Sequence, residues 1–193
     1  MGNGRLQGKT ALVTGSGQGI GEGIAKVFAS GGAEVVVATR TAASGKTTVD
    51  DITAAGGLAI LVPTDVQHQG DIDNAIDVTI KTYGKLDIMV HNAASFAGGM
   101  IEDYAPMDLE DSLSTNLKAA FSLAKASIPH MKELGGGRLL YTSSVTGPRV
   151  AMAGTSYYAA SKGGLNGFIK TAGLELAPLR ITVNGVEPGF IKT

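Results

Sequence analysis

The chain has 193 residues, of which 44% are hydrophobic and 17% charged, a composition typical of a globular domain large enough for one core. Its formal net charge of −1 excludes the strongly basic proteins that bind nucleic acid or acidic lipid surfaces. It has no cysteine, which excludes disulfides and thiolate metal sites and favours a cytoplasmic location, and no apolar run reaches the roughly 18 residues that span a bilayer.

Short apolar runs alternate with longer amphipathic ones along the chain. The apolar runs predict strands over residues 9–13, 34–38, 58–62, 86–90, 138–141 and 181–186. Helical spacing predicts helices over residues 20–30, 72–83, 109–131 and 157–177, with one more between the second and third strands. This alternation implies parallel βαβ units, so we expect an α/β fold with a doubly wound, Rossmann-like sheet in one domain spanning residues 1–193. Ligands bind such open sheets beyond the carboxyl ends of the strands.

A glycine-rich turn joins the first strand to the first helix. It reads Thr14-Gly15-Ser16-Gly17-Gln18-Gly19-Ile20-Gly21, which is the pattern T-G-x-x-x-G-x-G. Glycines allow a tight turn and close approach of the backbone, and the free N–H groups of the following helix attract a pyrophosphate. We therefore predict a dinucleotide site, with an ordinary loop as the alternative. The predicted contacts are Gly15, Ser16, Gln18, Gly19, Ile20 and Gly21.

The second strand ends without an acidic residue. NAD-preferring folds place Asp or Glu at this point to hold the ribose hydroxyls, whereas this chain has Thr39 followed by Arg40. A guanidinium can pair with a 2′-phosphate in a bidentate manner. The pair predicts NADP(H) rather than NAD(H), and the alternative is a solvated surface arginine.

Residues 40–47 read R-T-A-A-S-G-K-T and end like a phosphate-binding P-loop. A P-loop requires glycine where Arg40 stands, and it belongs after the first strand of such a fold rather than the second. We therefore interpret Gly45, Lys46 and Thr47 as a helix surface.

Tyr158 and Lys162 stand four residues apart near the start of the helix over 157–177, so they share one face. A nearby ammonium stabilises a phenolate, and a tyrosine tuned in this way can protonate a carbonyl oxygen or deprotonate an alcohol. The neighbouring Tyr157 has no lysine four residues on, which selects Tyr158. Ser144 directly follows the fifth strand, where its hydroxyl could bond the reacting oxygen.

In this order, these segments resemble the short-chain dehydrogenase/reductase family. The resemblance selects Ser144 over Ser143, because an apolar residue follows it. It implies that Asn116 holds a water connected to Lys162. Asn92 and Ala93 match the family's N-N-A-G segment near the cofactor, although His91 and Ala94 depart from it. Further cofactor contacts implied by the resemblance are Asp65 and Val66 at the adenine, and Pro188, Gly189, Ile191 and Thr193 at the nicotinamide.

The resemblance implies an NADP(H)-dependent oxidoreductase that moves hydride between nicotinamide and a carbonyl or alcohol. The local sequence resembles that of 3-oxoacyl carrier protein reductases and of sugar or small-alcohol dehydrogenases. Family members continue past the position of Thr193 with a substrate loop, a helix and a seventh strand, so a truncated chain is expected. The alternative function is therefore cofactor binding without turnover. The resemblance also implies a homodimer or homotetramer through the long helices. Neither His68 nor His130 lies in a metal-binding pattern.

Overall fold

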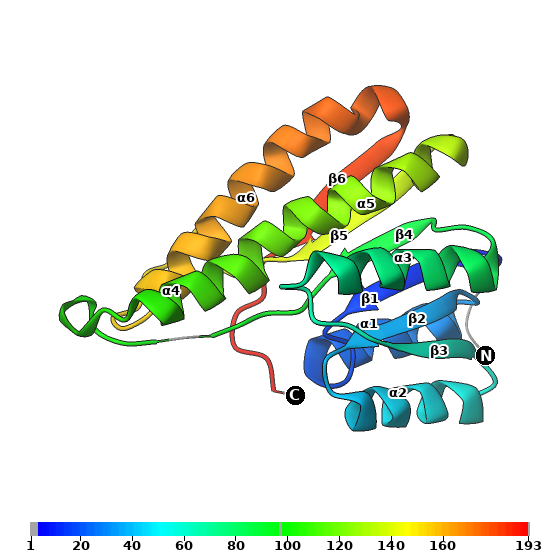
Figure 1. Ribbon diagram of the computed structural model, residues 1–193, viewed down its shortest axis with the longest axis horizontal. Coiled ribbons are helices and arrows are strands. Elements are labelled where there is room, and N and C mark those ends of the chain that lie inside the picture. The colour runs from blue at the N-terminus through cyan, green and yellow to red at the C-terminus, as the bar shows by residue number, and fades with distance from the viewer. Residues whose placement is uncertain (1–3, 97, 193) are drawn as a thin grey trace.

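Six parallel strands form a single sheet in the order β3-β2-β1-β4-β5-β6 (Figure 1). The computed structural model describes residues 4–96 and 98–192. The strands are β1 (Thr10–Thr14), β2 (Glu34–Thr39), β3 (Leu58–Pro63), β4 (Ile88–His91), β5 (Gly137–Thr142) and β6 (Ile181–Val186). The order reverses between β1 and β4, because the chain first builds outward through β2 and β3 and then returns to the other side of β1. This reversal is the switch point at which doubly wound sheets open a crevice for a ligand.

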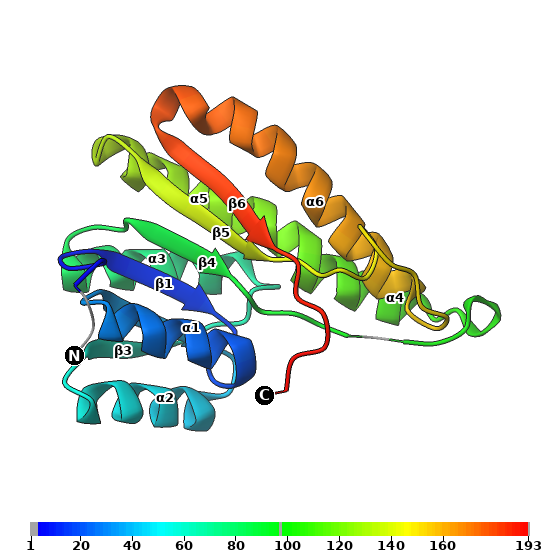
Figure 2. The same ribbon diagram turned by 180° about the vertical axis from the view of Figure 1, so that it is seen from behind.

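Helices connect the strands and lie on both faces of the sheet. They are α1 (Gly19–Ser30), α2 (Ala42–Ala54), α3 (Gln69–Tyr83), α4 (Pro106–Leu113), α5 (Ala119–Glu133) and α6 (Ser156–Leu176). Short 3-10 turns occupy Ile101–Asp103 and Ala177–Leu179, and a π-helical turn occupies Ser114–Lys118. Figures 1 and 2 show α3, α5 and α6 on one face and α1 and α2 on the other. The predicted doubly wound fold is confirmed.

The alternation of side chains along β1 creates two separate cores. Leu12 packs into the larger cluster with side chains from α3, α5 and α6. Its neighbours Ala11 and Val13 point to the opposite face and pack with α1 and α2. All five residues of β1 are buried. A strand covered on both faces is apolar over most of its length, which explains the apolar run of Ala11, Leu12 and Val13 between two buried threonines.

The structure corrects two of the predicted element boundaries. The fourth strand begins at Ile88 rather than at residue 86, because the Asp87 carboxylate turns back to bond Lys9 and the N–H of Thr10. The predicted helix over 109–131 is wrong as one regular helix. It consists of α4, the π-helical turn and α5, and Asn116 lies within the π turn. Such single π turns insert an extra residue, and they often mark functional sites.

The sixth strand lies at the edge of the sheet and pairs only with β5 within the described residues. No helix in that same part of the chain is long and apolar enough to cross a membrane.

Two glycines near the start of α1 provide a matched test of this packing. A methyl group on Gly21 would overlap the carbonyl oxygen of Gly15 and the Asn92 amide, whereas one on Gly23 would meet nothing within 4 Å. We expect Gly21→Ala to destabilise the protein by about 1–3 kcal/mol. Gly23→Ala should stabilise it by about 0.5–1 kcal/mol, since alanine costs less backbone entropy in a helix. Thermal unfolding monitored by circular dichroism measures both, and equal effects would refute the close packing at Gly21.

Candidate functional site

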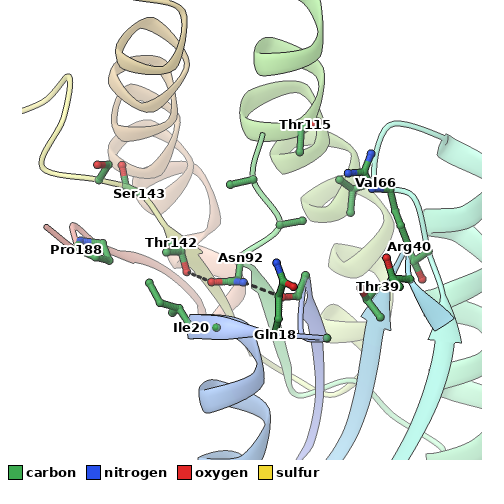
Figure 3. Close-up of a pocket in the computed structure, with 18 of the residues that line it drawn as sticks. Gln18, Ile20, Thr39, Arg40, Val66, Asn92, Thr115, Thr142, Ser143 and Pro188 are labelled. Carbon is green, nitrogen blue, oxygen red and sulfur yellow. Dashed lines mark hydrogen bonds between the residues drawn. The ribbon is translucent and has the colours of Figure 1, made fainter. Parts of the chain in front are cut away.

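A cleft of about 430 Å³ opens at the carboxyl edge of the sheet, over the switch point between β1 and β4 (Figure 3). Most of the predicted site residues line it, although they come from every part of the chain. They are Gly15, Gln18, Gly19, Ile20, Thr39, Arg40, Asp65, Val66, Asn92, Ala93, Ser144, Tyr158, Lys162, Pro188 and Gly189. The sheet therefore gathers segments that the sequence alone left far apart.

Four of the predicted site residues that the structure describes do not line this cleft. Ser16 and Gly21 lie beneath the glycine turn, where the Ser16 hydroxyl donates to the carbonyl of Val13. Asn116 is fully buried behind the cleft, and Ile191 is half exposed beyond it. Thr193 lies outside the described residues.

Several lining residues were not anticipated from the sequence. They are Gly17, Thr41, Ser44, Thr64, Ala94, Thr115, Thr142 and Ser143. Thr64 and Thr142 stand at strand ends, where the position alone could have identified them. Thr115 could not be found in this way, because it reaches the cleft from the π turn rather than from a strand end.

The glycine turn has the backbone geometry that close approach requires. Gly15 and Gly19 adopt positive φ angles of 64° and 59°. A side chain at Gly15 would collide with the backbone of Ala93 across the cleft floor. No side chain caps the first turn of α1, so its N–H groups remain open to an anion. This cradle fits the pyrophosphate of a dinucleotide.

Asn92 joins the ends of three strands beneath the cleft, as Figure 3 shows. Its amide donates to the carbonyl of Gly15 at 3.2 Å, and its oxygen accepts the Thr142 hydroxyl at 3.1 Å. Its backbone N–H donates to the Thr14 hydroxyl at 3.1 Å. One side chain thus fixes the glycine turn after β1 to the ends of β4 and β5.

His91 is a buried, neutral imidazole rather than a cleft residue. Nε2 lies 3.0 Å from the carbonyl oxygen of Thr115, which can only accept, so Nε2 carries the proton. Nδ1 therefore accepts from the Thr14 hydroxyl at 3.1 Å. Burial, reinforced by the charge of Lys162, lowers the pKa of His91 to about 3.

Lys162 is buried to 2% exposure at the end of the cleft nearest Tyr158. Its Nζ donates to the carbonyl of Thr142 at 2.8 Å and lies 5.6 Å from the centroid of the Tyr158 ring. Burial lowers the pKa of Lys162 to about 8, because a low-dielectric environment disfavours the ammonium.

The two adjacent tyrosines face different surroundings. Tyr157 is buried, its hydroxyl accepts the N–H of Ala105 at 3.1 Å, and its ring packs edge-on against Tyr104. Tyr158 lines the cleft instead, and its ring lies 5.0 Å from that of Phe96. Tyr157 is therefore engaged in packing, while the Tyr158 side chain borders the open space.

The two adjacent serines are also distinguished by their bonds. The Ser143 hydroxyl donates to the Asn166 side chain on α6 at 2.6 Å. The Ser144 hydroxyl accepts the N–H of Thr146 at 3.0 Å, which leaves its proton available for a further acceptor. Both line the cleft, but only the Ser144 hydroxyl has its donor function uncommitted among the bonds at this strand end.

The Asn116 side chain connects the π turn to two distant segments. Its oxygen accepts the N–H of Ser95 at 2.8 Å, and its amide donates to the Ser95 carbonyl and the Ser161 hydroxyl, each at 2.9 Å. The Ser161 hydroxyl in turn donates to the carbonyl of Tyr158 at 2.7 Å. The amide is thus committed to holding the loop after β4 against α6.

The opposite end of the cleft carries the charged groups. Arg40 is 69% exposed, and its guanidinium lies 3.9 Å from the Asp65 carboxylate. Asp65 also accepts the N–H of Gln67, so it caps a turn in addition to lining the cleft. Gly45 proves to be buried, since α2 packs there against Thr39 and Leu61, whereas Lys46 is a surface side chain paired with Asp50.

Metal ligation has no support in residues 4–96 and 98–192, where no three His, Cys, Asp or Glu side chains converge.

A family model described as short chain dehydrogenase matches residues 9–193. The oxidoreductase UcpA of Salmonella typhimurium is 36% identical over 190 residues, which cover 98% of this chain and 72% of UcpA. The chain belongs to the short-chain dehydrogenase family.

Solved structures support this membership and indicate the cofactor type. A short chain dehydrogenase from Burkholderia cenocepacia, in complex with NADP, is 40% identical with a TM-score of 0.90, covering 96% of this chain and 75% of that one. A 7α-hydroxysteroid dehydrogenase, complexed with NADH and 7-oxo glycochenodeoxycholic acid, is 33% identical with a TM-score of 0.93, covering 97% and 72%. This short-chain dehydrogenase is therefore an oxidoreductase that acts with a nicotinamide cofactor.

The buried imidazole makes stability depend on pH. The pKa of His91 is about 3 in the folded state, against an ordinary histidine pKa of 6.5. Below pH 6.5 the unfolded chain therefore takes up a proton that the folded protein refuses, so the free energy of unfolding falls with falling pH down to about 3. The expected slope is about 1.4 kcal/mol per pH unit.

Urea denaturation at pH 7.5 and pH 5.0 measures this effect in the wild type and in His91→Asn. We expect the wild type to lose about 2 kcal/mol more than the variant over that interval. Equal losses would mean that the imidazole is protonated in the folded protein.

Proposed function

We propose that this short-chain dehydrogenase interconverts a carbonyl and an alcohol with NADP(H), using Tyr158 as the proton donor and acceptor. The observation that carries the proposal is the placement of Tyr158 on the cleft wall with the buried Lys162 ammonium 5.6 Å from its ring. A cation at this distance would stabilise the charge that develops on the phenol oxygen while its proton is transferred. Tyr158 can therefore release a proton to a substrate oxygen and recover it in the reverse direction.

We assign the cofactor contacts to residues that line the cleft. The glycine turn and the N-terminus of α1 would hold the pyrophosphate, Asp65 and Val66 the adenine, and Asn92, Ala93, Pro188 and Gly189 the nicotinamide end. When bound, the nicotinamide supplies or accepts hydride at the substrate carbon. For Ile191 and Thr193, a contact with the nicotinamide stays a prediction from the family resemblance.

Two further side chains assist Tyr158 in this proposal. The Ser144 hydroxyl has its proton free, so it would donate a hydrogen bond to the reacting oxygen. Asn116 acts through its neighbours, because its amide bonds fix Ser95 and the Ser161 hydroxyl behind Tyr158. We therefore assign Asn116 a positioning role. The predicted water beside Lys162 would then be bound by groups other than the Asn116 side chain.

The preference for NADP(H) rests on Arg40. Its exposed guanidinium stands at the cleft margin beside Thr39, Thr41 and Ser44, and these side chains carry no negative charge. A 2′-phosphate there would gain charge-assisted bonds. Asp65 lies nearby, but at 3.9 Å it holds the guanidinium only loosely.

Assembly into a homodimer or homotetramer is proposed on family resemblance alone. Its surface would come from the long helices α4, α5 and α6, where Met107, Phe121 and Leu174 are exposed.

Tyr158→Phe and Tyr157→Phe test the proton donor. The first removes the proposed acid, so turnover should fall by about 100-fold or more. The second removes only a bond to the Ala105 N–H, which should cost about 1 kcal/mol of stability while most turnover remains. Loss of NADPH absorbance with a panel of ketones measures turnover. Comparable activity in both variants would reject Tyr158, and NADPH binding without turnover of any ketone would favour a cofactor-binding protein.

Arg40→Ala tests the cofactor preference. Removing the guanidinium should weaken NADPH binding by about 10- to 100-fold, the usual worth of a hydrogen bond to a charged group. NADH binding should stay nearly unchanged, because NADH has no 2′-phosphate. Calorimetric titration of each cofactor measures both affinities. Tighter binding of NADH than of NADPH by the wild type would overturn the assignment.

A further inference from the structure

Two loops border the end of the cleft that Tyr158 lines. One follows β4 over residues 92–100, and the other follows β5 over residues 143–155. The N–H of Gly99 donates to the carbonyl of Gly154 at 2.9 Å, so the loops lie side by side, as Figures 1 and 2 also show. If Tyr158 is the proton donor, a substrate must reach it between or beside these two loops.

Phe96 projects from the first loop directly at Tyr158. The two ring centroids are 5.0 Å apart with an interplanar angle of 58°. Yet Phe96 is 66% exposed, so one part of its ring contacts Tyr158 while the rest faces open space. An exposed aromatic ring beside a cleft is costly to leave in water and gains from covering by another apolar surface.

The backbone next to Phe96 is held in place. Asn116 bonds both the N–H and the carbonyl of Ser95, at 2.8 and 2.9 Å. The Ser95 hydroxyl also donates to the Asp111 carboxylate, whose other oxygen accepts from Gln67 at 2.5 Å. The residue before Phe96 is thus tied to the π turn and to α4. Phe96 is therefore presented on an anchored segment.

The surrounding loops offer no charge to a substrate. Residues 92–100 contain no Asp, Glu, Lys or Arg, and residues 143–155 contain only Arg149. The Arg149 guanidinium is already paired, since its Nε donates to Glu187 at 2.7 Å. The half-exposed side chains on these loops include Met100, Val150 and Met152. An anionic substrate group would lose hydration here without gaining a partner.

We propose that Phe96 forms one wall of the substrate site and selects uncharged ketones, or their alcohols, whose carbonyl belongs to a flat apolar ring system. The inference rests on the proposed function of Tyr158. The substrate ring packs against the free part of the Phe96 ring, which brings the ring-borne oxygen to the Tyr158 hydroxyl. Charged and short open-chain ketones gain nothing from this wall.

Steady-state kinetics with NADPH and three ketones test the proposal: β-tetralone with a flat bicyclic frame, cyclohexanone with one small ring, and levulinate with a carboxylate. The wild type should prefer β-tetralone in kcat/KM. Phe96→Ala should lower that value by about tenfold and leave cyclohexanone nearly unchanged. Phe96→Tyr should restore it, because the ring is retained. Val27→Ala, which removes an exposed apolar side chain on α1, is the control and should behave as wild type.

The outcomes separate this proposal from the function on which it rests. Equal loss for β-tetralone and cyclohexanone in Phe96→Ala, or a preference for levulinate in the wild type, would overturn the role of Phe96 and leave Tyr158 untouched. If no ketone turns over, the function proposed above fails. Calorimetric titration of β-tetralone onto the NADP-saturated protein then decides. Binding that Phe96→Ala abolishes and Val27→Ala keeps supports the wall, and absence of binding overturns it.

Discussion

The Thr14 hydroxyl, at the carboxyl end of β1, makes the contacts on which the rest of the site depends. It accepts the N–H groups of Asn92 and Ala93 and donates to the neutral imidazole of His91. The Nε2–H of the imidazole in turn donates to the Thr115 carbonyl in the π turn. All these groups are shielded from water, so each unmade bond would cost its full desolvation penalty. The strand ends can therefore take few other arrangements, and the cleft floor is correspondingly rigid.

Lys162 is the main electrostatic cost of this site. Its buried ammonium donates to the Thr142 carbonyl and lies near the Tyr158 ring, and burial lowers its pKa to about 8. Because the folded pKa lies below the ordinary lysine pKa of 10.5, the penalty is largest below about pH 8 and fades as pH rises toward 10.5. Buried charged groups that destabilise the fold are often found at functional sites. The burial of Lys162 agrees with its proposed role beside Tyr158.

The cleft has two chemically different ends. Arg40 and Asp65 supply charge at the ends of β2 and β3, where a dinucleotide phosphate and adenine would lie. The Tyr158 end is bordered by loops whose one arginine is already paired with Glu187. This division favours a charged cofactor at one end and an uncharged substrate at the other.

The sequence by itself determined the features that depend on near neighbours in the chain. The period of apolar residues indicated the strands, the glycines marked the turn after β1, and the four-residue spacing placed Tyr158 and Lys162 on one helical face. The tertiary structure alone decided what depends on distant partners. The π turn at Asn116 exists with bonds to Ser95 and Ser161, which lie 21 and 45 positions away. The contact of Phe96 with Tyr158 likewise joins the loop after β4 to helix α6. Local spacing fixes backbone geometry within a few residues, but packing chooses which surfaces meet, and that choice appears only in the folded protein.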